Sequence, residues 1–276
     1  MAEKTVAVIG AGPAGLVAAK CMQDARLLPT VFDRAAKVGG MWNSDASLCW
    51  GSLRTNLSRH TCQFSDLPWR NDAADFPTQR QIEAYLTEYT AKFIPKEQLF
   101  LGTEVTAVTP TEGDRWSVCW RTSSAANSSG NCGDGGSSNS DGSSLSQQDS
   151  SESSAVFDHV VVASGFFSSP HAPDIPGLGD FCSGCGAVMH SSEYRSPAAF
   201  AGKRVLVLGA SFSAVELAAE VAPHAAAVIH AVPRPLWVLP RYLPASAEGP
   251  ESPRPAFLPL DLVLYRSTNR TYAKEV

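Results

Sequence analysis

Apolar runs and glycine-rich turns follow one another in the same order at two places along this chain. At the first place, the apolar run 6–9 leads into Gly10-Ala-Gly-Pro-Ala-Gly15, then into the apolar segment 16–19 and, later, into the run 30–32. A short apolar run next to glycines is typical of a buried strand, and the longer apolar segment behind the glycines is typical of a helix. The pattern predicts a strand, a tight turn, a helix and a second strand.

The second place repeats this order. The segment 203–208, which is apolar from Val205 onward, leads into Gly209-Ala-Ser-Phe-Ser-Ala214, a predicted helix at 215–221 and a further mostly apolar run at 226–232. Ser211 and Ala214 stand where the first place has glycines, and both are small. The repeat predicts an α/β fold with two Rossmann-like dinucleotide-binding units. We expect the second unit to be incomplete, because a mononucleotide-binding half needs three strands and only two precede the proline-rich stretch 233–259.

The region between the two units predicts one helix and several strands. Thr78 and Gln81 have the spacing of a capping box, and apolar residues recur at helical spacing over 79–93. Three further apolar runs predict strands, at 99–108, 115–120 and 155–163. Ser, Gly, Asn and Asp dominate the segment 122–154, which we expect to be a disordered insertion at a hairpin tip because it has too little apolar surface to bury.

These elements predict a domain boundary near residue 200. We expect one dinucleotide-binding domain over 1–195 and a partial one over 200–276 that is truncated at its C-terminus. An unfinished parallel sheet leaves an open edge. We therefore expect the chain to be a truncated product, a shortened gene model or one piece of a longer enzyme.

The glycines of the first turn predict a phosphate site. Gly10 permits a tight turn, Gly12 lets the backbone approach a pyrophosphate, and Gly15 allows the helix to pack closely on the strand. The helix N-terminus adds unpaired N–H groups and a positive dipole end. Asp33 follows the second strand about 20 residues later, where an acid accepts hydrogen bonds from ribose hydroxyls.

The second turn predicts a different nucleotide. Its second strand ends without an acid, and Arg234 follows instead. A guanidinium suits a 2′-phosphate, so the pattern favours NADP over NAD. A solvent-facing arginine in a proline turn is the open alternative. An acid at one site and a base at the other predict two cofactors, FAD and NADP, between which hydride can pass.

Composition bears on which binding partners and which cellular compartment we expect for the protein. The net charge of −5 provides no field for nucleic acid or an anionic membrane, and no run approaches the ~18 apolar residues of a membrane segment. Seven scattered cysteines favour a reduced, cytoplasmic compartment. Cys182 and Cys185 could form a redox dithiol or half of a zinc site, but no second pair has ligand spacing and the pair does not follow a strand at a helix start. We therefore expect ordinary loop cysteines and no metal.

Several stretches together carry a resemblance to a known family: Gly10 to Gly15, Phe32-Asp33-Arg34 with Gly39-Gly40-Met41-Trp42, Leu53 to Ser58, Phe64 to Pro68, Ala163-Ser164-Gly165, and Gly209 to Ala214. With them, the chain resembles the N-terminal part of a class B flavoprotein monooxygenase, of the flavin-containing monooxygenase family. The family's Phe-x-Gly-x-x-x-His-x-x-x-Tyr pattern is matched by Gly186, His190 and Tyr194. Its phenylalanine is either Phe181, followed by a three-residue insertion, or replaced by Gly184.

The resemblance implies roles for individual residues. Asp33 would bind the FAD ribose, Met41 and Trp42 would line the adenosine side, and Asn56 would act as the catalytic residue beside the flavin and the nicotinamide. Arg234 would hold the 2′-phosphate. The other implied cofactor-binding residues are Gly10, Gly12, Pro13, Ala14, Gly15, Arg34, Gly40, Thr55, Leu57, Ser164, Gly165, Gly209, Ser211, Phe212, Ser213 and Ala214.

The resemblance also implies an activity. Such an enzyme uses NADPH and molecular oxygen to oxygenate a nitrogen- or sulfur-containing small molecule through a flavin hydroperoxide, in the manner of N,N-dimethylaniline monooxygenase. Two alternatives stay open. One is a truncated, non-catalytic FAD- and NADP-binding remnant, and the other is a flavin-dependent disulfide reductase with Cys182 and Cys185 as its dithiol. Homodimer formation also stays open.

Overall fold

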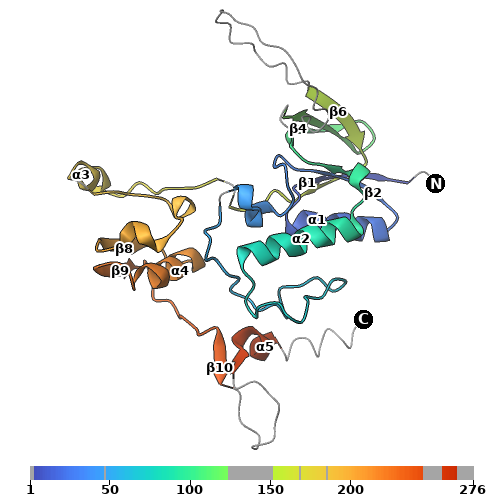
Figure 1. Ribbon diagram of the computed structural model, residues 1–276. Helices are drawn as coiled ribbons and strands as arrows, with labels where there is room; N and C mark the ends of the chain where they lie inside the picture. Colours follow the sequence, from blue (N-terminus) through green and yellow to red (C-terminus); the bar gives the residue numbers. More distant parts are fainter. Residues whose placement is uncertain are drawn as a thin grey trace, which may run out of the picture. The chain divides into compact units, whose positions relative to one another are not determined.

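The computed structural model describes residues 3–46, 48–123, 152–167, 169–184, 186–244 and 257–265 (Figure 1). The chain forms two compact units. The first consists of Met1–Ala46 and Leu86–Ser168, and the second consists of Ser47–Tyr85 and Ser169–Val276. The long insertion lies within the sequence of the first unit, and its residues 124–151 are outside the described residues.

A parallel sheet forms the centre of the first unit. Its strand order is β3-β2-β1-β7, with the bounds Leu99–Phe100, Leu28–Phe32, Thr5–Ile9 and His159–Val162. Helix α1 (Pro13–Asp24) follows β1 and packs on the sheet. Val6, Ala7 and Val8 are all fully buried, as expected for a central strand that is covered on both faces. The predicted strand, turn, helix and second strand are confirmed.

A second sheet in this unit is antiparallel. It contains β4 (Thr103–Thr111), β5 (Arg115–Thr122) and β6 (Glu152–Phe157), in the order β4-β5-β6. Strands β5 and β6 pair from Trp116 opposite Phe157 to Arg121 opposite Glu152, so the two strands that flank the insertion form the predicted hairpin. The disorder predicted for 122–154 falls largely on residues outside the described ranges.

Two predicted strands are wrong as single elements. The run 99–108 divides into β3 and β4 at Gly102, whose φ of +62° turns the chain out of the parallel sheet. The run 155–163 divides into β6 and β7 at Asp158, whose carboxylate accepts hydrogen bonds from the Thr5 N–H at 2.8 Å and from the Thr5 hydroxyl at 3.1 Å. Each run therefore contributes one strand to the parallel sheet and one to the antiparallel sheet. The apolar pattern of the sequence does not predict this division.

Helix α2 (Gln79–Phe93) confirms the predicted helix and its cap. The Thr78 N–H donates to Gln81 Oε1 at 3.0 Å, and the Gln81 N–H donates to the Thr78 hydroxyl at 3.4 Å. Ile82, Leu86 and Tyr89 are buried, so the apolar stripe is part of the core.

The second unit contains the repeat of the strand–turn–helix pattern. Strand β8 (Arg204–Leu208) is followed by α4 (Phe212–Val221) and by β9 (Ala227–Ala231), which pairs with β8 in parallel. The remaining elements with hydrogen-bonded ladders or helical turns are α3 (Leu178–Ser183), β10 (Tyr242–Pro244), β11 (Phe257–Pro259) and α5 (Leu260–Tyr265). Short 3-10 turns lie at Gly40–Trp42, Ser44–Ala46 and Lys96–Gln98 in the first unit and at Ser191–Glu193 and Pro197–Phe200 in the second.

The core of the second unit lies on one side of the two-stranded sheet. Trp50, Tyr194, Leu217 and Val221 form a buried cluster against which Val205 and Val228 pack. On the opposite side of the strands, Leu206, Leu208 and Ile229 are each more than half exposed. Within the described residues, this parallel sheet has two strands, as the sequence predicted. No helix among the described residues is long and apolar enough to cross a membrane.

Candidate cofactor-binding site

Two glycines of the first turn are required by the packing of the protein itself. Gly10 has a φ of +112°, and a Cβ atom there would lie 2.4 Å from the Ala163 carbonyl oxygen. A Cβ atom on Gly15 would lie 1.8 Å from the Gly10 carbonyl oxygen. Both obstacles are backbone atoms, which cannot rotate away. Gly15 therefore lets α1 pack closely on β1, as predicted. Gly10 has the positive φ of the predicted tight turn and also lets the chain after β7 approach, which the sequence did not predict.

Gly12 is different because the protein leaves room for a side chain there. Its φ of −77° and ψ of −178° suit any residue, and a Cβ atom would meet only Gly40, at an ordinary contact of 3.5 Å from its Cα atom. The packing of the chain thus does not explain a glycine at this position. A helix N-terminus with open space beside it can accept an anion, which is the ligand that the sequence predicts for Gly12. Pro13 occupies the first turn of the helix.

Asp33 lies beside this turn, as the sequence predicted. Its Oδ2 atom accepts a hydrogen bond from the Ala11 N–H at 2.6 Å, and its Oδ1 atom accepts one from the Ala35 N–H at 2.8 Å. These bonds fix the carboxylate at the end of β2. Two carboxylate oxygens can together accept about four hydrogen bonds, so capacity remains for ribose hydroxyls. The neighbouring Arg34 is exposed.

The segment Gly39–Trp42 completes one side of the turn. The Gly39 N–H donates to the Ala11 carbonyl at 2.9 Å, and Gly40 is so close to Gly12 that a Cβ atom on Gly40 would lie 3.0 Å from the Gly12 Cα atom. Met41 and Trp42 follow in the same 3-10 turn. The structure thus brings this predicted segment to the glycine turn.

Two other predicted residues follow β7. The Ala163 N–H donates to the Ile9 carbonyl at 2.8 Å, which keeps the chain beside β1 up to this point. Ser164 and Gly165 come next and are exposed, and Gly165 has a φ of +80°. They leave the sheet at the same end as the glycine turn, because β1 and β7 are parallel.

The turn of the second unit has the same form. Gly209 has a φ of +133°, and its N–H donates to the Ala231 carbonyl at 3.1 Å. Ser211 occupies the N-cap position of α4, and no side-chain hydrogen bond caps that end, so the first N–H groups of the helix are available to a ligand. Ser211, Phe212 and Ser213 are exposed, whereas Ala214 is buried. Arg234 is exposed in the bend after β9.

The segment that contains Asn56 also belongs to the second unit. Thr55 is buried, and its N–H donates to the Pro77 carbonyl at 2.9 Å. The Thr55 hydroxyl is buried without a hydrogen-bond partner among the described residues. Asn56 and Leu57 are exposed. A buried threonine thus fixes the backbone next to two side chains that are accessible to a ligand.

Phe181 lies against Gly186 in the structure, although the spacing between the two residues in the sequence departs from the family pattern. A Cβ atom on Gly186 would lie 2.3 Å from Cε1 of Phe181, so the ring lies directly against this glycine. The Gly186 N–H also donates to the Phe181 carbonyl at 3.0 Å. These contacts favour Phe181 over Gly184 as the phenylalanine of the pattern, with an insertion behind it.

His190 and Tyr194 have structural roles in this region. His190 Nδ1 lies 2.8 Å from the Ser192 hydroxyl and accepts a hydrogen bond from the Ser192 N–H at 3.2 Å. The ring of Tyr194 packs edge-on against Trp50 at a centroid distance of 5.6 Å. Burial, together with the charge of Glu220, raises the pKa of Tyr194 to about 12. Of the two cysteines in the alternative dithiol reading, Cys182 is exposed in α3, and Cys185 lies outside the described residues.

Comparison with known proteins agrees with this geometry. A family model described as flavin-binding monooxygenase-like matches residues 3–248, which cover both glycine turns. The chain belongs to this family. Family membership confirms the predicted fold class and supports the predicted cofactor pair, FAD and NADP.

Two curated relatives of this chain are named dimethylaniline monooxygenases. It is 33% identical to dimethylaniline monooxygenase (N-oxide-forming) 4 of Mus musculus over 87% of this chain and 40% of that protein. It is 32% identical to dimethylaniline monooxygenase (N-oxide-forming) 2 of Cavia porcellus over 86% of this chain and 41% of that protein. The chain thus spans about two fifths of the length of the curated relatives it matches.

A solved structure shares the fold. S-allyl-L-cysteine S-oxygenase from Allium sativum superposes with a TM-score of 0.69 and 27% identity, over 90% of this chain and 54% of that one. The likeness extends over most of this chain and supports the α/β architecture of two dinucleotide-binding units.

Sequence reasoning missed three residues that support the predicted site. His230 Nε2 lies 2.7 Å from the Gly209 carbonyl oxygen, and this contact holds the glycine turn of the second unit in place. Glu220 and Asp261 bind the two ends of the segment around Asn56. The carboxylates act on residues about 170 and 200 positions away, and no local pattern in the sequence signals such a pairing.

Proposed function

We propose that this chain binds FAD at the turn of the first unit and NADP at the turn of the second, as part of an NADPH- and oxygen-dependent monooxygenase. The overall reaction takes NADPH, a proton, O2 and a soft nucleophile, and yields NADP⁺, water and the oxygenated nucleophile. Bound flavin would supply the step that the protein's side chains cannot, since it accepts hydride and reacts with O2. The observation that carries the proposal is Gly12, a glycine that protein packing does not require, at a helix N-terminus in a chain of the flavin-binding family.

The residues around the turn have defined tasks in this proposal. The N–H groups at the start of α1 bind the pyrophosphate, and Asp33 accepts hydrogen bonds from the ribose. Met41 and Trp42 contact the adenosine side. In the second unit, the N–H groups at the start of α4 bind the NADP pyrophosphate, and Arg234 pairs with the 2′-phosphate.

The substrate class rests on two relatives. One acts on dimethylaniline by forming an N-oxide, and the other is an S-oxygenase of S-allyl-L-cysteine. An amine nitrogen and a thioether sulfur are both soft nucleophiles with an accessible lone pair. We therefore propose a nitrogen- or sulfur-containing small molecule as the substrate, with Asn56 as the residue beside the reacting groups. The scattered cysteines lead us to place the protein in the cytoplasm.

Absorbance spectroscopy and a turnover assay test the proposal. We expect the purified chain to show flavin bands, or to acquire them with added FAD, and to oxidise NADPH with formation of dimethylaniline N-oxide. Replacement of Asn56 by alanine should leave the flavin bands and reduce N-oxide formation. A chain that stays colourless with excess FAD contradicts the proposal.

A non-catalytic nucleotide-binding role is the second candidate. This role predicts bound FAD without NADPH oxidation. The disulfide reductase alternative is disfavoured by the monooxygenase family match. Replacing Cys182 and Cys185 by serine should leave turnover intact.

A further inference from the structure

The exposed residue Asn56 lies between two anchor points that are both made by carboxylates from distant parts of the second unit. We propose that Glu220 and Asp261 are positioning residues, which fix the two ends of the segment 50–61 and so set the place of Asn56. The inference deepens the proposed function and rests on it, because Asn56 is the residue assigned to the reacting groups. Neither carboxylate is proposed to touch a cofactor or a substrate.

Glu220, in the last turn of α4, holds the N-terminal end of the segment. Its Oε2 atom accepts a hydrogen bond from Trp50 Nε1 at 2.8 Å, and its Oε1 atom accepts one from the Ser52 hydroxyl at 2.5 Å. Trp50 is 6% exposed and packs in the cluster with Leu217 and Val221 of the same helix. Both oxygens of one carboxylate thus bind two residues of one loop.

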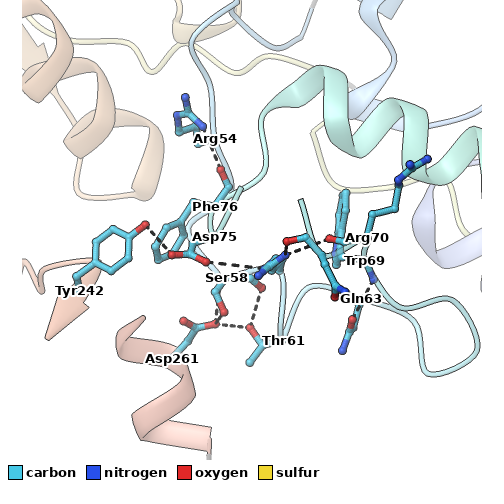
Figure 2. A network of polar contacts seen from close by, with 12 residues as sticks. Arg54, Ser58, Thr61, Gln63, Trp69, Arg70, Asp75, Phe76, Tyr242 and Asp261 are labelled. Atoms are coloured by element: carbon cyan, nitrogen blue, oxygen red, sulfur yellow. Dashed lines mark hydrogen bonds and ion pairs between the residues drawn. The ribbon is translucent and has the colours of Figure 1, made fainter. Parts of the chain in front are cut away.

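Asp261, in α5, holds the C-terminal end. Its Oδ2 atom accepts hydrogen bonds from the Ser58 N–H and the Ser58 hydroxyl, both at 2.8 Å, and a third from the Thr61 hydroxyl (Figure 2). Ser58 and Asp261 are both buried. Burial disfavours the carboxylate, but these hydrogen bonds outweigh it and hold the pKa of Asp261 below its ordinary value. The bonded form at neutral pH is therefore the charged one.

Further contacts hold the part of the segment that follows Ser58. The guanidinium of Arg59 donates to the carbonyls of Arg70 and Asn71 at 3.0 and 2.9 Å. The backbone N–H of Arg59 donates to the Asp75 carbonyl at 2.7 Å. Tyr242 reaches the carboxylate of Asp75 with its hydroxyl at 3.3 Å, as Figure 2 shows. These contacts fix the backbone after Ser58, whereas the Asn56 side chain stays exposed.

Helix α4 links the segment 50–61 to the proposed nucleotide-binding turn. The helix begins at the turn that we propose for the NADP pyrophosphate and carries Glu220 in its last turn. One continuous helix therefore connects the nucleotide turn to the segment around Asn56. The first turn of α4 would bind the nucleotide, and the last turn of the same helix holds the segment around Asn56. The helix would therefore fix the position of Asn56 relative to the bound nicotinamide nucleotide.

Hydrogen exchange of the purified chain, followed by mass spectrometry, tests the inference without any cofactor. In Glu220→Ala we expect the amides of residues 50–57 to exchange at least about fivefold faster than in the unmodified chain, because two hydrogen bonds that hold them are lost. Glu220→Gln should recover most of the protection, since its amide oxygen can still accept one of the bonds. Asp261→Ala should have the same effect on residues 58–61.

Glu216→Ala is the matched control, since Glu216 lies one turn earlier on α4 and binds Arg241 at 2.6 Å instead of the segment. We expect its exchange at residues 50–61 to equal that of the unmodified chain. If Glu220→Ala does not fold, Trp50→Phe keeps a buried aromatic ring, loses the Nε1 donor together with part of the indole, and should accelerate the same amides. Unchanged exchange in the carboxylate variants, or equal acceleration in Glu216→Ala, would overturn the inference.

A kinetic readout on FAD-loaded protein separates positioning from general stability. We expect Glu220→Ala to lower kcat for N-oxide formation at least about fivefold with KM for NADPH within about twofold, because the segment and not the nucleotide turn is displaced. A rise in KM with kcat unchanged would contradict this assignment. If the unmodified chain binds no FAD, the proposed function fails, and the exchange experiment still decides whether the carboxylates hold the segment.

Discussion

Alanine at Gly12 and alanine at Gly15 should have opposite effects on the protein, although the two glycines belong to one turn. At Gly15 the new Cβ atom would lie 1.8 Å from the Gly10 carbonyl oxygen and 2.9 Å from its carbon, and both atoms belong to the backbone. At Gly12 it would make only an ordinary contact of 3.5 Å. The first change is therefore a test of packing, and the second is a test of ligand binding.

The expected sizes follow from these distances. Alanine gains about 1 kcal/mol over glycine inside a helix, but forcing extra volume into a packed site costs about 1–3 kcal/mol or more. Because the obstacle at Gly15 is rigid backbone, we expect a net loss of about 2 kcal/mol, or a fall of about 4–8 °C in Tm. Gly12→Ala should leave Tm unchanged or slightly raised, since its backbone angles suit alanine and the unfolded chain loses freedom.

Binding should show the reverse. A Cβ atom at Gly12 would stand between the N–H groups of α1 and a phosphate, and losing one charge-assisted hydrogen bond costs about 1.5–3 kcal/mol. We expect FAD affinity to fall at least about tenfold in Gly12→Ala. Differential scanning fluorimetry of the cofactor-free proteins and a flavin fluorescence titration measure the two effects. A Gly12→Ala variant that binds FAD as tightly as the parent, or a Gly15→Ala variant with an unchanged Tm, would refute the reasoning.

Three further expectations can be checked separately. Arg234→Ala should weaken NADPH by about 1.5–3 kcal/mol and NADH much less, as measured by titration; equal losses would remove the 2′-phosphate assignment. Hydrogen bonds from Thr5 lower the pKa of Asp158, so its contribution to stability is present above the unfolded pKa of about 3.9 and is lost as the pH falls through the lower folded value; Asp158→Asn should therefore lower Tm at pH 7, by an amount that shrinks toward pH 3 in thermal scans. Burial raises the pKa of Cys49 to about 11, so iodoacetamide at pH 8 should modify the exposed Cys182 well before Cys49, and mass spectrometry that finds Cys49 modified first would contradict its burial.

Local features of the sequence were sufficient for the elements that depend on neighbouring residues. The turn Gly10–Gly15, the Asp33 that follows, the repeat at Gly209 and the capping box at Thr78 all act within about 25 residues, through backbone sterics and short hydrogen bonds. Their positions in the structure agree with the pattern. The position of Asp33 followed because the second strand of such a unit pairs in parallel with the first.

Tertiary structure decided where long apolar runs divide and what holds the exposed segment around Asn56. The run 155–163 predicted one strand, although the polar pair Asp158-His159 interrupts it. The chain leaves one sheet for the other at Asp158, whose carboxylate accepts a hydrogen bond from Thr5, 153 residues earlier in the sequence. Glu220 and Asp261 are ordinary surface-type residues in the sequence and become anchors only when folding brings Trp50 and Ser58 to them. The reason is physical: backbone conformation is set by near neighbours, whereas the partner of a buried polar group is chosen by the packing of the whole unit.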